Sequence, residues 1–292
     1  MNVRHPAGAT ALPVPMITGH TELIVHIGHP THSFKAPMIY NPFFAHQGID
    51  AVVVPMDCTS DHYPTLLQAV FGLGNVRGAL ITMPHKVSTV ALLDQASAAV
   101  RVAGACNAVR RDAQGRLVGD MFDGEGFVRG VMRKGLTLQG ARALVVGSGG
   151  VGCAIAASLA GAGVGLLGLF DVHAPSAEGL AARLRENHPH IDVHVGSRDP
   201  AGYDLIVNAT PLGMNPNDPL PLDVSRLTPE MFVGEVVMKT EITPLLAAAQ
   251  ACGCRTQVGT DMLFEQIPAY LEFFGLPSTS AEQLRALATL QY

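Results

Sequence analysis

The stretch "LVVGSGGVGCAIAASLAGAG", residues 144–163, decides how the second half of the chain folds. Gly147, Gly149 and Gly152 form the pattern G-x-G-x-x-G between an apolar strand and an alanine-rich helix. The first glycine of this pattern permits a tight turn, the second lets backbone approach a pyrophosphate, and the third lets helix pack closely on strand. A merely flexible loop is the alternative, but here strand, motif and helix coincide. The stretch therefore predicts a dinucleotide site with the phosphates on a helix N-terminus, formed by Gly147, Ser148, Gly149, Gly150, Val151 and Gly152.

The next apolar run ends in Asp171, about 20 residues after the glycines, where an acid accepts hydrogen bonds from an adenosine ribose. Val172 and His173 follow, and no arginine stands beside the acid. A carboxylate repels the 2′-phosphate of NADP, so the sequence predicts NAD as cofactor and NADP as second choice. Two alternatives stay open: Asp171 as a cap of the next helix, and some tolerance of phosphate through His173.

Short apolar runs alternate with helical segments on both sides of this stretch, which is typical of parallel sheets with crossover helices. The expected strands lie near residues 22–27, 51–56, 78–83, 165–171, 192–196, 204–210 and 231–238, with a hairpin within 105–122. We expect an α/β protein with an N-terminal α/β substrate-binding domain, residues 1–123, and a C-terminal Rossmann-type NAD(P)-binding domain, residues 124–259. Helices within residues 260–292 are expected to pack back on the first domain.

Composition limits the classes of function. Hydrophobic residues make up 48% of the 292 residues and charged residues 15%, which suits a compact enzyme. A net charge of −5 without a basic cluster argues against a nucleic-acid partner. No apolar run reaches the length of a membrane span, and prolines interrupt the first 22 residues. We expect a cytoplasmic protein without membrane association, and the five scattered cysteines and 12 histidines predict no metal site.

A second informative stretch is "GALITMPHK", residues 78–86, in which a strand runs through Thr82 and a proline to Lys86. Taken alone, such a lysine is more often a solvated surface charge than a catalytic group.

Linked motifs change that interpretation. Besides "TMPHK" and "GSGGVG", the chain contains "GACNAV", "FDGEGF", "NATPLGM" and "GTDMLFEQ" in this order. Over residues 22 to about 275 the chain resembles the shikimate dehydrogenase family. The resemblance implies reversible NAD(P)-linked oxidation of a hydroxyl on a cyclic hydroxy acid. It also implies that Lys86 and Asp123 are the catalytic pair, as expected if a positioned amine or carboxylate takes the hydroxyl proton while the carbonyl forms.

The same resemblance implies further site residues. Thr82, Asn107 and Gln266 match positions that hydrogen-bond the substrate, although each has an alternative as a satisfied turn or helix-end polar group. Residues matched to the nicotinamide half of the cofactor site are Thr210, Val236 and Gly259.

The segment that would grip a substrate carboxylate departs from the family. Where the family has two serines in S-x-S-P, a gapless alignment places Phe34 and Ala36 here, and only a one-residue shift brings in Ser33 as a substrate-binding residue. Met238 stands in place of the family's substrate tyrosine, and Leu80 in place of an asparagine. We expect a changed carboxylate pocket, typical of a divergent branch of the family. Lys35 is either its replacement anchor or a solvated lysine.

The predicted function is reversible hydride transfer between NAD and shikimate, quinate or a related cyclic hydroxy acid. Two alternatives remain: an NAD-dependent reductase of a different small ring compound, and a catalytically weak NAD-binding regulatory protein. The expected partner is a small molecule, and the chain is expected to be a monomer or homodimer.

Overall fold

The computed structural model describes residues 16–32 and 34–290, and its contacts divide the chain into two compact units. The first holds the described residues up to Pro84 and those from Thr279 onward, and the second runs from His85 to Ser278. Compact units defined by contacts need not coincide with functional domains. The domains proposed from sequence, residues 1–123 and 124–259, therefore remain a prediction.

The first unit contains a parallel sheet in which strand β1 (Glu22–Gly28) lies between β2 (Ala51–Asp57) and β3 (Val76–Ile81). All three predicted strands are confirmed. Their near-continuous apolar sequences are typical of strands buried on both faces. Two helices connect them, α1 (Pro37–Gln47) and α2 (Tyr63–Val70).

The last helix of the first unit is the short α9 (Ala281–Leu287), which contacts α1. Beyond it, the Thr289 backbone N–H donates to the Met38 carbonyl at 2.9 Å. The end of the chain thus packs on α1 of the first unit, whereas the longer helix α8 (Gly259–Phe273) lies in the second unit.

The second unit contains a six-stranded parallel sheet with the order β12-β11-β10-β7-β8-β9. Numbered along the chain from β7, this is the order 6-5-4-1-2-3 of a dinucleotide-binding fold. The predicted fold class is confirmed. The strands are β7 (Arg142–Val146), β8 (Leu166–Phe170), β9 (Asp192–Val195), β10 (Leu205–Asn208), β11 (Phe232–Glu235) and β12 (Arg255–Gln257).

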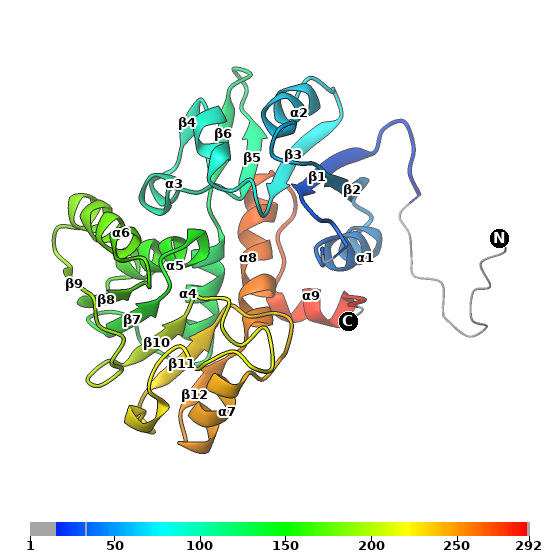
Figure 1. The fold of residues 1–292 in the computed structure, drawn as a ribbon. Coiled ribbons are helices and arrows are strands. Elements are labelled where there is room, and N and C mark those ends of the chain that lie inside the picture. The colour runs from blue at the N-terminus through cyan, green and yellow to red at the C-terminus, as the bar shows by residue number, and fades with distance from the viewer. Residues whose placement is uncertain (1–15, 33, 291–292) are drawn as a thin grey trace. The chain divides into compact units, whose positions relative to one another are not determined.

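Helices cover both faces of this sheet (Figure 1). On one face α4 (Asp123–Arg133) contacts α5 (Gly150–Gly161), and its Phe127 ring lies against Gly234 of β11. On the other face an apolar cluster joins alternate strand residues such as Ile206 and Val233 to α7 (Pro244–Ala251). Helix α6 (Ala174–Asn187) packs on β8 and β9. The period-two alternation of strand side chains produces this division between the two faces.

The rest of the second unit precedes and follows this sheet. It contains the 3₁₀ turns η1 (Ser88–Leu92) and η2 (Val224–Arg226), strand β4 (Gln95–Ala96), helix α3 (Ala98–Ala103), and the hairpin β5 (Ala108–Arg111) and β6 (Leu117–Asp120). The predicted hairpin is confirmed by antiparallel pairing of β5 with β6. Helix α8 packs along α4, where Lys134 Nζ lies 2.6 Å from Asp261 Oδ2 and Arg133 Nε lies 2.5 Å from Glu265 Oε1. Among the described helices, none combines the length and apolar character needed to cross a bilayer.

Candidate active site

Lys86 and Asp123 form a close ion pair in the second unit. Lys86 Nζ donates to Asp123 Oδ2 at 2.5 Å, with side-chain exposures of 16% and 6%. Asp123 is the first residue of α4, where the helix dipole favours a carboxylate. The lysine backbone is held as well, since the Lys86 carbonyl accepts from the Cys106 backbone N–H at 2.8 Å. The two residues matched as a catalytic pair are therefore brought together, shielded from most of the solvent.

Asn107 fixes the carboxylate from its other side. Its Nδ2 donates to Asp123 Oδ1 at 3.0 Å, and its Oδ1 accepts from the Phe122 backbone N–H at 2.9 Å. Asn107 is 1% exposed and stands just before β5. Its amide group thus orients Asp123 directly, and one Nδ2 hydrogen remains for another acceptor.

Gln266 lies on α8, which packs against α4. Its Cβ is 2.7 Å from the position that a Cβ would take on Gly126, one turn beyond Asp123. The residue is 7% exposed, and its Oε1 is a buried acceptor without a hydrogen-bond partner among the described residues. A buried unpaired acceptor of this kind is normally satisfied by a ligand or water.

The glycine loop has the geometry of a phosphate site. Gly147 adopts φ +104°, which favours glycine, and a Cβ on Gly152 would lie 2.0 Å from the Gly147 carbonyl oxygen. Apart from Gly149 itself and its chain neighbours, no described atom lies within 4 Å of a Cβ placed on Gly149, so the loop leaves space for a ligand at this position. The Ser148 hydroxyl is buried without a partner among the described residues. These features fit a pyrophosphate on the loop.

Asp171 follows β8 and is tied to the same loop. Its Oδ2 accepts from the Ser148 backbone N–H at 2.7 Å and its Oδ1 from the His173 backbone N–H at 2.9 Å. The N-cap of α6 is His173, so Asp171 does not cap that helix. Each carboxylate oxygen keeps a further lone pair, which fits ribose hydroxyls.

Thr210, Val236 and Gly259 lie on the side of the loop away from Asp171. Thr210 follows β10, Val236 follows β11, and Gly259 begins α8. The Thr210 methyl is 3.0 Å from the position of a Cβ on Gly147, so the Thr210 turn contacts the glycine loop directly. In this strand order the two halves of a dinucleotide extend to opposite sides of the first strand, β7. The positions of Thr210, Val236 and Gly259 therefore fit the half of the dinucleotide that lies away from Asp171.

The first unit presents an aromatic ring beyond the carboxyl end of β1. Phe34 Cζ lies 2.8 Å, and Thr82 Cγ2 2.4 Å, from the position of a Cβ on Gly28. The Phe34 ring also stacks on His26 with centroids 4.0 Å apart. Thr82 therefore lies beside an apolar ring, and Ala36, the buried N-cap of α1, offers no hydroxyl.

Three other residues were also predicted to belong to the carboxylate pocket. Ser33 lies outside the described residues. Lys35 is half-buried in the first unit, and Met238 is half-buried beyond β11 in the second.

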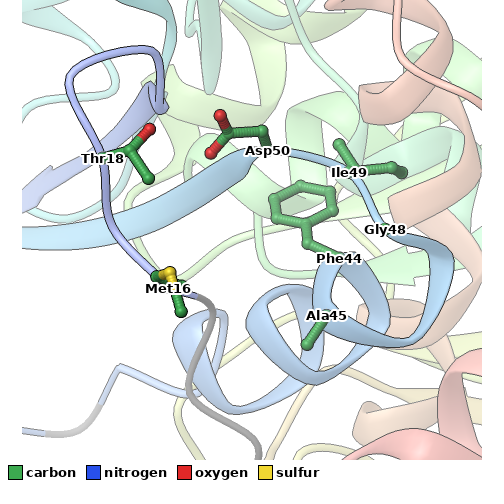
Figure 2. Close-up of a pocket in the computed structure, with 7 residues that line it drawn as sticks. All are labelled: Met16, Thr18, Phe44, Ala45, Gly48, Ile49 and Asp50. Atoms are coloured by element: carbon green, nitrogen blue, oxygen red, sulfur yellow. The ribbon is translucent and has the colours of Figure 1, made fainter.

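Figure 2 shows a hollow of about 320 Å³ in the first unit, lined by Met16, Thr18, Phe44, Ala45, Gly48, Ile49 and Asp50. It lies where α1 ends and β2 begins, at the amino ends of the parallel strands. Thr82 and Phe34 lie at the carboxyl ends, where α/β sheets bind ligands. The hollow is therefore separate from the predicted site residues of this unit.

Sequence reasoning missed Glu235, the last residue of β11. It is 0% exposed, and its Oε2 accepts from the Thr243 hydroxyl at 2.9 Å. Burial raises the pKa of its carboxyl to about 7, and the hydrogen bonds from Thr243 and Asn208 only partly oppose this. A glutamate inside the predicted strand 231–238 was the available signal, since a charged residue there requires either exposure or a partner.

Comparisons with known proteins identify the family of the chain. A family model described as the shikimate dehydrogenase substrate binding domain matches residues 26–109, and a model of the ThiF family matches residues 130–191. A shikimate dehydrogenase (NADP(+)) from Rubrobacter xylanophilus is 35% identical over 280 residues, which cover 94% of this chain and 98% of the relative. The chain belongs to the shikimate dehydrogenase family.

Solved structures from the family share the fold over nearly the whole chain. Shikimate 5-dehydrogenase from Listeria monocytogenes, in complex with shikimate and NAD, is 28% identical with a TM-score of 0.86, covering 93% of this chain and 97% of that one. Quinate dehydrogenase from Corynebacterium glutamicum, in complex with NAD, is 33% identical with a TM-score of 0.82, covering 91% and 98%. The resemblance inferred from the motifs is confirmed.

Proposed function

We propose that the chain catalyses reversible NAD(P)-linked oxidation of a ring hydroxyl in shikimate, quinate or a related cyclic hydroxy acid. The observation that carries the proposal is the shielded Lys86–Asp123 pair, held by Asn107 in the same unit as the glycine loop. Membership of a dehydrogenase family supports the same reaction class.

Oxidation of a carbinol removes a hydride from carbon and a proton from oxygen. The bound nicotinamide supplies the hydride acceptor. Lys86 and Asp123 handle the proton: they share one short hydrogen bond, so a proton received by either group is one transfer from the other. Asn107 keeps Asp123 aligned through Oδ1, and a positioned acid–base group contributes roughly 10² to 10⁴ in rate.

The remaining site residues are proposed to orient the substrate. Gln266 Oε1 is a buried acceptor that a substrate hydroxyl would satisfy. Asn107 keeps an Nδ2 hydrogen for a further acceptor. Thr82 in the first unit and Ser33 are the candidates proposed from the sequence motifs. Such contacts convert binding energy into the alignment that hydride transfer requires.

We further propose that NAD is preferred over NADP. Asp171 supports this, because its carboxylate is held beside the glycine loop by the Ser148 and His173 backbone N–H groups and would repel the 2′-phosphate of NADP. The comparisons favour neither cofactor, since curated relatives are named for NADP(+) and the two solved relatives above carry NAD. The ratio of kcat/KM for NAD and NADP tests the preference, and a clear excess for NADP would refute it.

The Phe34 ring is a specific reason to keep a second substrate class in the test. An apolar ring beside Thr82 gives no hydrogen bond to a carboxylate, so a neutral small ring compound is the second candidate.

The experiment is a panel of cyclic hydroxy acids and their neutral analogues, each assayed for reduced-cofactor formation with NAD and with NADP. We expect turnover of shikimate or quinate, lost in Lys86→Met and Asp123→Asn. Turnover confined to neutral compounds would move the function to the second candidate. Cofactor binding without turnover of any compound would instead indicate a regulatory protein.

A further inference from the structure

Glu235 is a buried carboxyl group without a charged partner on the strands beside it. Its Oε2 accepts from Thr243 Oγ1 at 2.9 Å and from Asn208 Nδ2 at 3.5 Å, while its Oε1 has no partner among the described residues. The side chain lies on the face of the sheet where Val233 and Leu246 belong to the apolar cluster. An ionised carboxylate in such surroundings is costly, and the protonated acid is favoured.

The carboxyl group is linked to the turn that follows β10. Asn208 is the register partner of Glu235, and its Oδ1 accepts from the Thr210 backbone N–H at 3.1 Å and from the Thr210 hydroxyl at 2.6 Å. Its Nδ2 also donates to the Leu212 carbonyl at 3.0 Å. Asn208 therefore shapes the Thr210 turn, which packs against Gly147 of the glycine loop.

Two more segments lie next to Glu235, one through the backbone and one through the carboxyl group. Val236 and Val237 follow Glu235 directly, and a Cβ on Gly259 would lie 2.1 Å from the Val237 carbonyl oxygen. Thr243, which donates to Glu235, is the N-cap of α7. Glu235 is thus linked through its carboxyl group and Asn208 to the Thr210 turn, and through the backbone that follows it to Val236 and Gly259, although its side chain is fully buried.

We propose that Glu235 is a positioning residue that, as a neutral carboxylic acid, holds the Thr210 turn and the Val236–Val237 segment in the arrangement that receives the nicotinamide half of the dinucleotide. This inference rests on the proposed function for its ligand. Ionisation places a charge in the apolar cluster, where Oε1 has no partner among the described residues and the two hydrogen bonds to Oε2 do not replace its lost hydration. Water must then reach the carboxylate, and its entry displaces the two segments. Affinity for the nicotinamide half therefore falls as pH rises through neutrality.

The side chains that contact the Glu235 carboxyl do not titrate, so the expected pH dependence is assigned to Glu235 itself. From β10 it faces Asn208 and from α7 Thr243, both neutral, and α7 carries no titratable side chain. Arg142 and Arg255 stand at the amino ends of β7 and β12.

The loops that flank Glu235 carry three further charged groups. Lys239 and Glu241 are exposed. Asp218 accepts from the Asn215 and Gly213 backbone N–H groups, which lower its pKa, so it stays ionised near neutrality.

The test compares NADH with ADP-ribose, which lacks the nicotinamide, by direct binding titration at about pH 6 and about pH 8. For a group titrating near neutrality we expect NADH affinity of the wild type to fall up to about tenfold between these values. ADP-ribose affinity should change less than about twofold. In Glu235→Gln, which keeps the shape without the charge, NADH affinity should stay at its low-pH value at both pH values. His173→Gln, beside Asp171, is the matched control and should keep the fall.

The outcomes separate this inference from the proposed function. NADH affinity that is equal at both pH values, an equal fall for ADP-ribose, or an unchanged fall in Glu235→Gln would overturn the role of Glu235. The first two need no variant, so misfolding of Glu235→Gln cannot mask them. Absence of NADH binding at either pH would overturn the proposed function and this inference with it. The expected profile without turnover of any hydroxy acid would refute only the proposed reaction.

Discussion

Two regions that sequence motifs assign to one reaction are built differently. Around Lys86 and Asp123, polar side chains bond one another, and Asn107 uses both of its amide atoms to hold the carboxylate and the chain beside it. Beyond β1, the segment that would grip a substrate carboxylate offers the Phe34 ring, stacked on His26, and the small Ala36. Under the proposed function, the pair that transfers the proton is kept while the segment that would hold the substrate carboxylate is changed.

The largest expected effect concerns the first region. Lys86→Ala should lower kcat by about 10² to 10⁴ because it removes half of the proton-handling pair, with cofactor affinity little changed. Steady-state kinetics and a cofactor titration measure both.

Lys35→Ala in the second region is the matched control and should leave kcat unchanged. A rise in KM there would identify Lys35 as a carboxylate anchor. Near-normal kcat in Lys86→Ala would remove the basis for treating the first region as catalytic.

The second prediction concerns hydroxyl groups introduced into the segment beyond β1. Phe34→Ser combined with Ala36→Ser should lower KM for shikimate by about tenfold or more, since a hydrogen bond to a charged group contributes roughly 1.5 to 3 kcal/mol. Phe34→Ala with Ala36 unchanged removes the ring without adding a hydroxyl and is the matched control. If the control lowers KM equally, the ring obstructs the substrate and the missing hydroxyls do not account for the predicted high KM.

The third prediction concerns Asp171 in the cofactor region. Asp171→Ala should narrow the preference for NAD over NADP by about tenfold, or about 1.4 kcal/mol, because repulsion of the 2′-phosphate is relieved. The kcat/KM ratio for the two cofactors, in wild type and variant, measures this. An unchanged ratio would show that Asp171 has no part in cofactor choice.

The smallest effect is on stability. Glu235 has a folded-state pKa of about 7, raised from 4.5 by burial, so its contribution is fully present below about pH 4.5 and is lost as pH rises through 7. Between about pH 6 and pH 8 the free energy of unfolding should fall by about 1 kcal/mol more in wild type than in Glu235→Gln. Urea unfolding of both proteins at each pH measures the difference. Parallel pH dependence would mean that Glu235 does not titrate in this range.

Sequence patterns predicted the parts of the molecule that local physics dictates. Apolar runs predicted the strands, and the glycines with Asp171 predicted a loop and an acid that the structure ties by a backbone hydrogen bond to Ser148. Strand β12 was missed because "RTQ" is short and polar, and it pairs only through its neighbour β11.

Contacts between distant residues had no sequence signal. Nothing in the sequence around Asn107 indicates its hydrogen bond to Asp123. The position of Phe34 beside Gly28 depends on how the chain turns after β1. The burial of Glu235 likewise depends on α7 covering the sheet. Patterns along the chain thus predict elements, whereas pairings across the fold come from packing.

The saturation curve of wild-type turnover with shikimate and NAD tests the central claim most directly, because it separates the two regions in one experiment. An intact proton-handling pair with a changed carboxylate segment predicts kcat within the ordinary enzyme range, about 1 to 10³ s⁻¹, together with KM of about 1 mM or above. Micromolar KM would contradict the account of the segment around Phe34 and Ala36. Absence of turnover with shikimate, quinate and related acids at every concentration would contradict the account of Lys86 and Asp123.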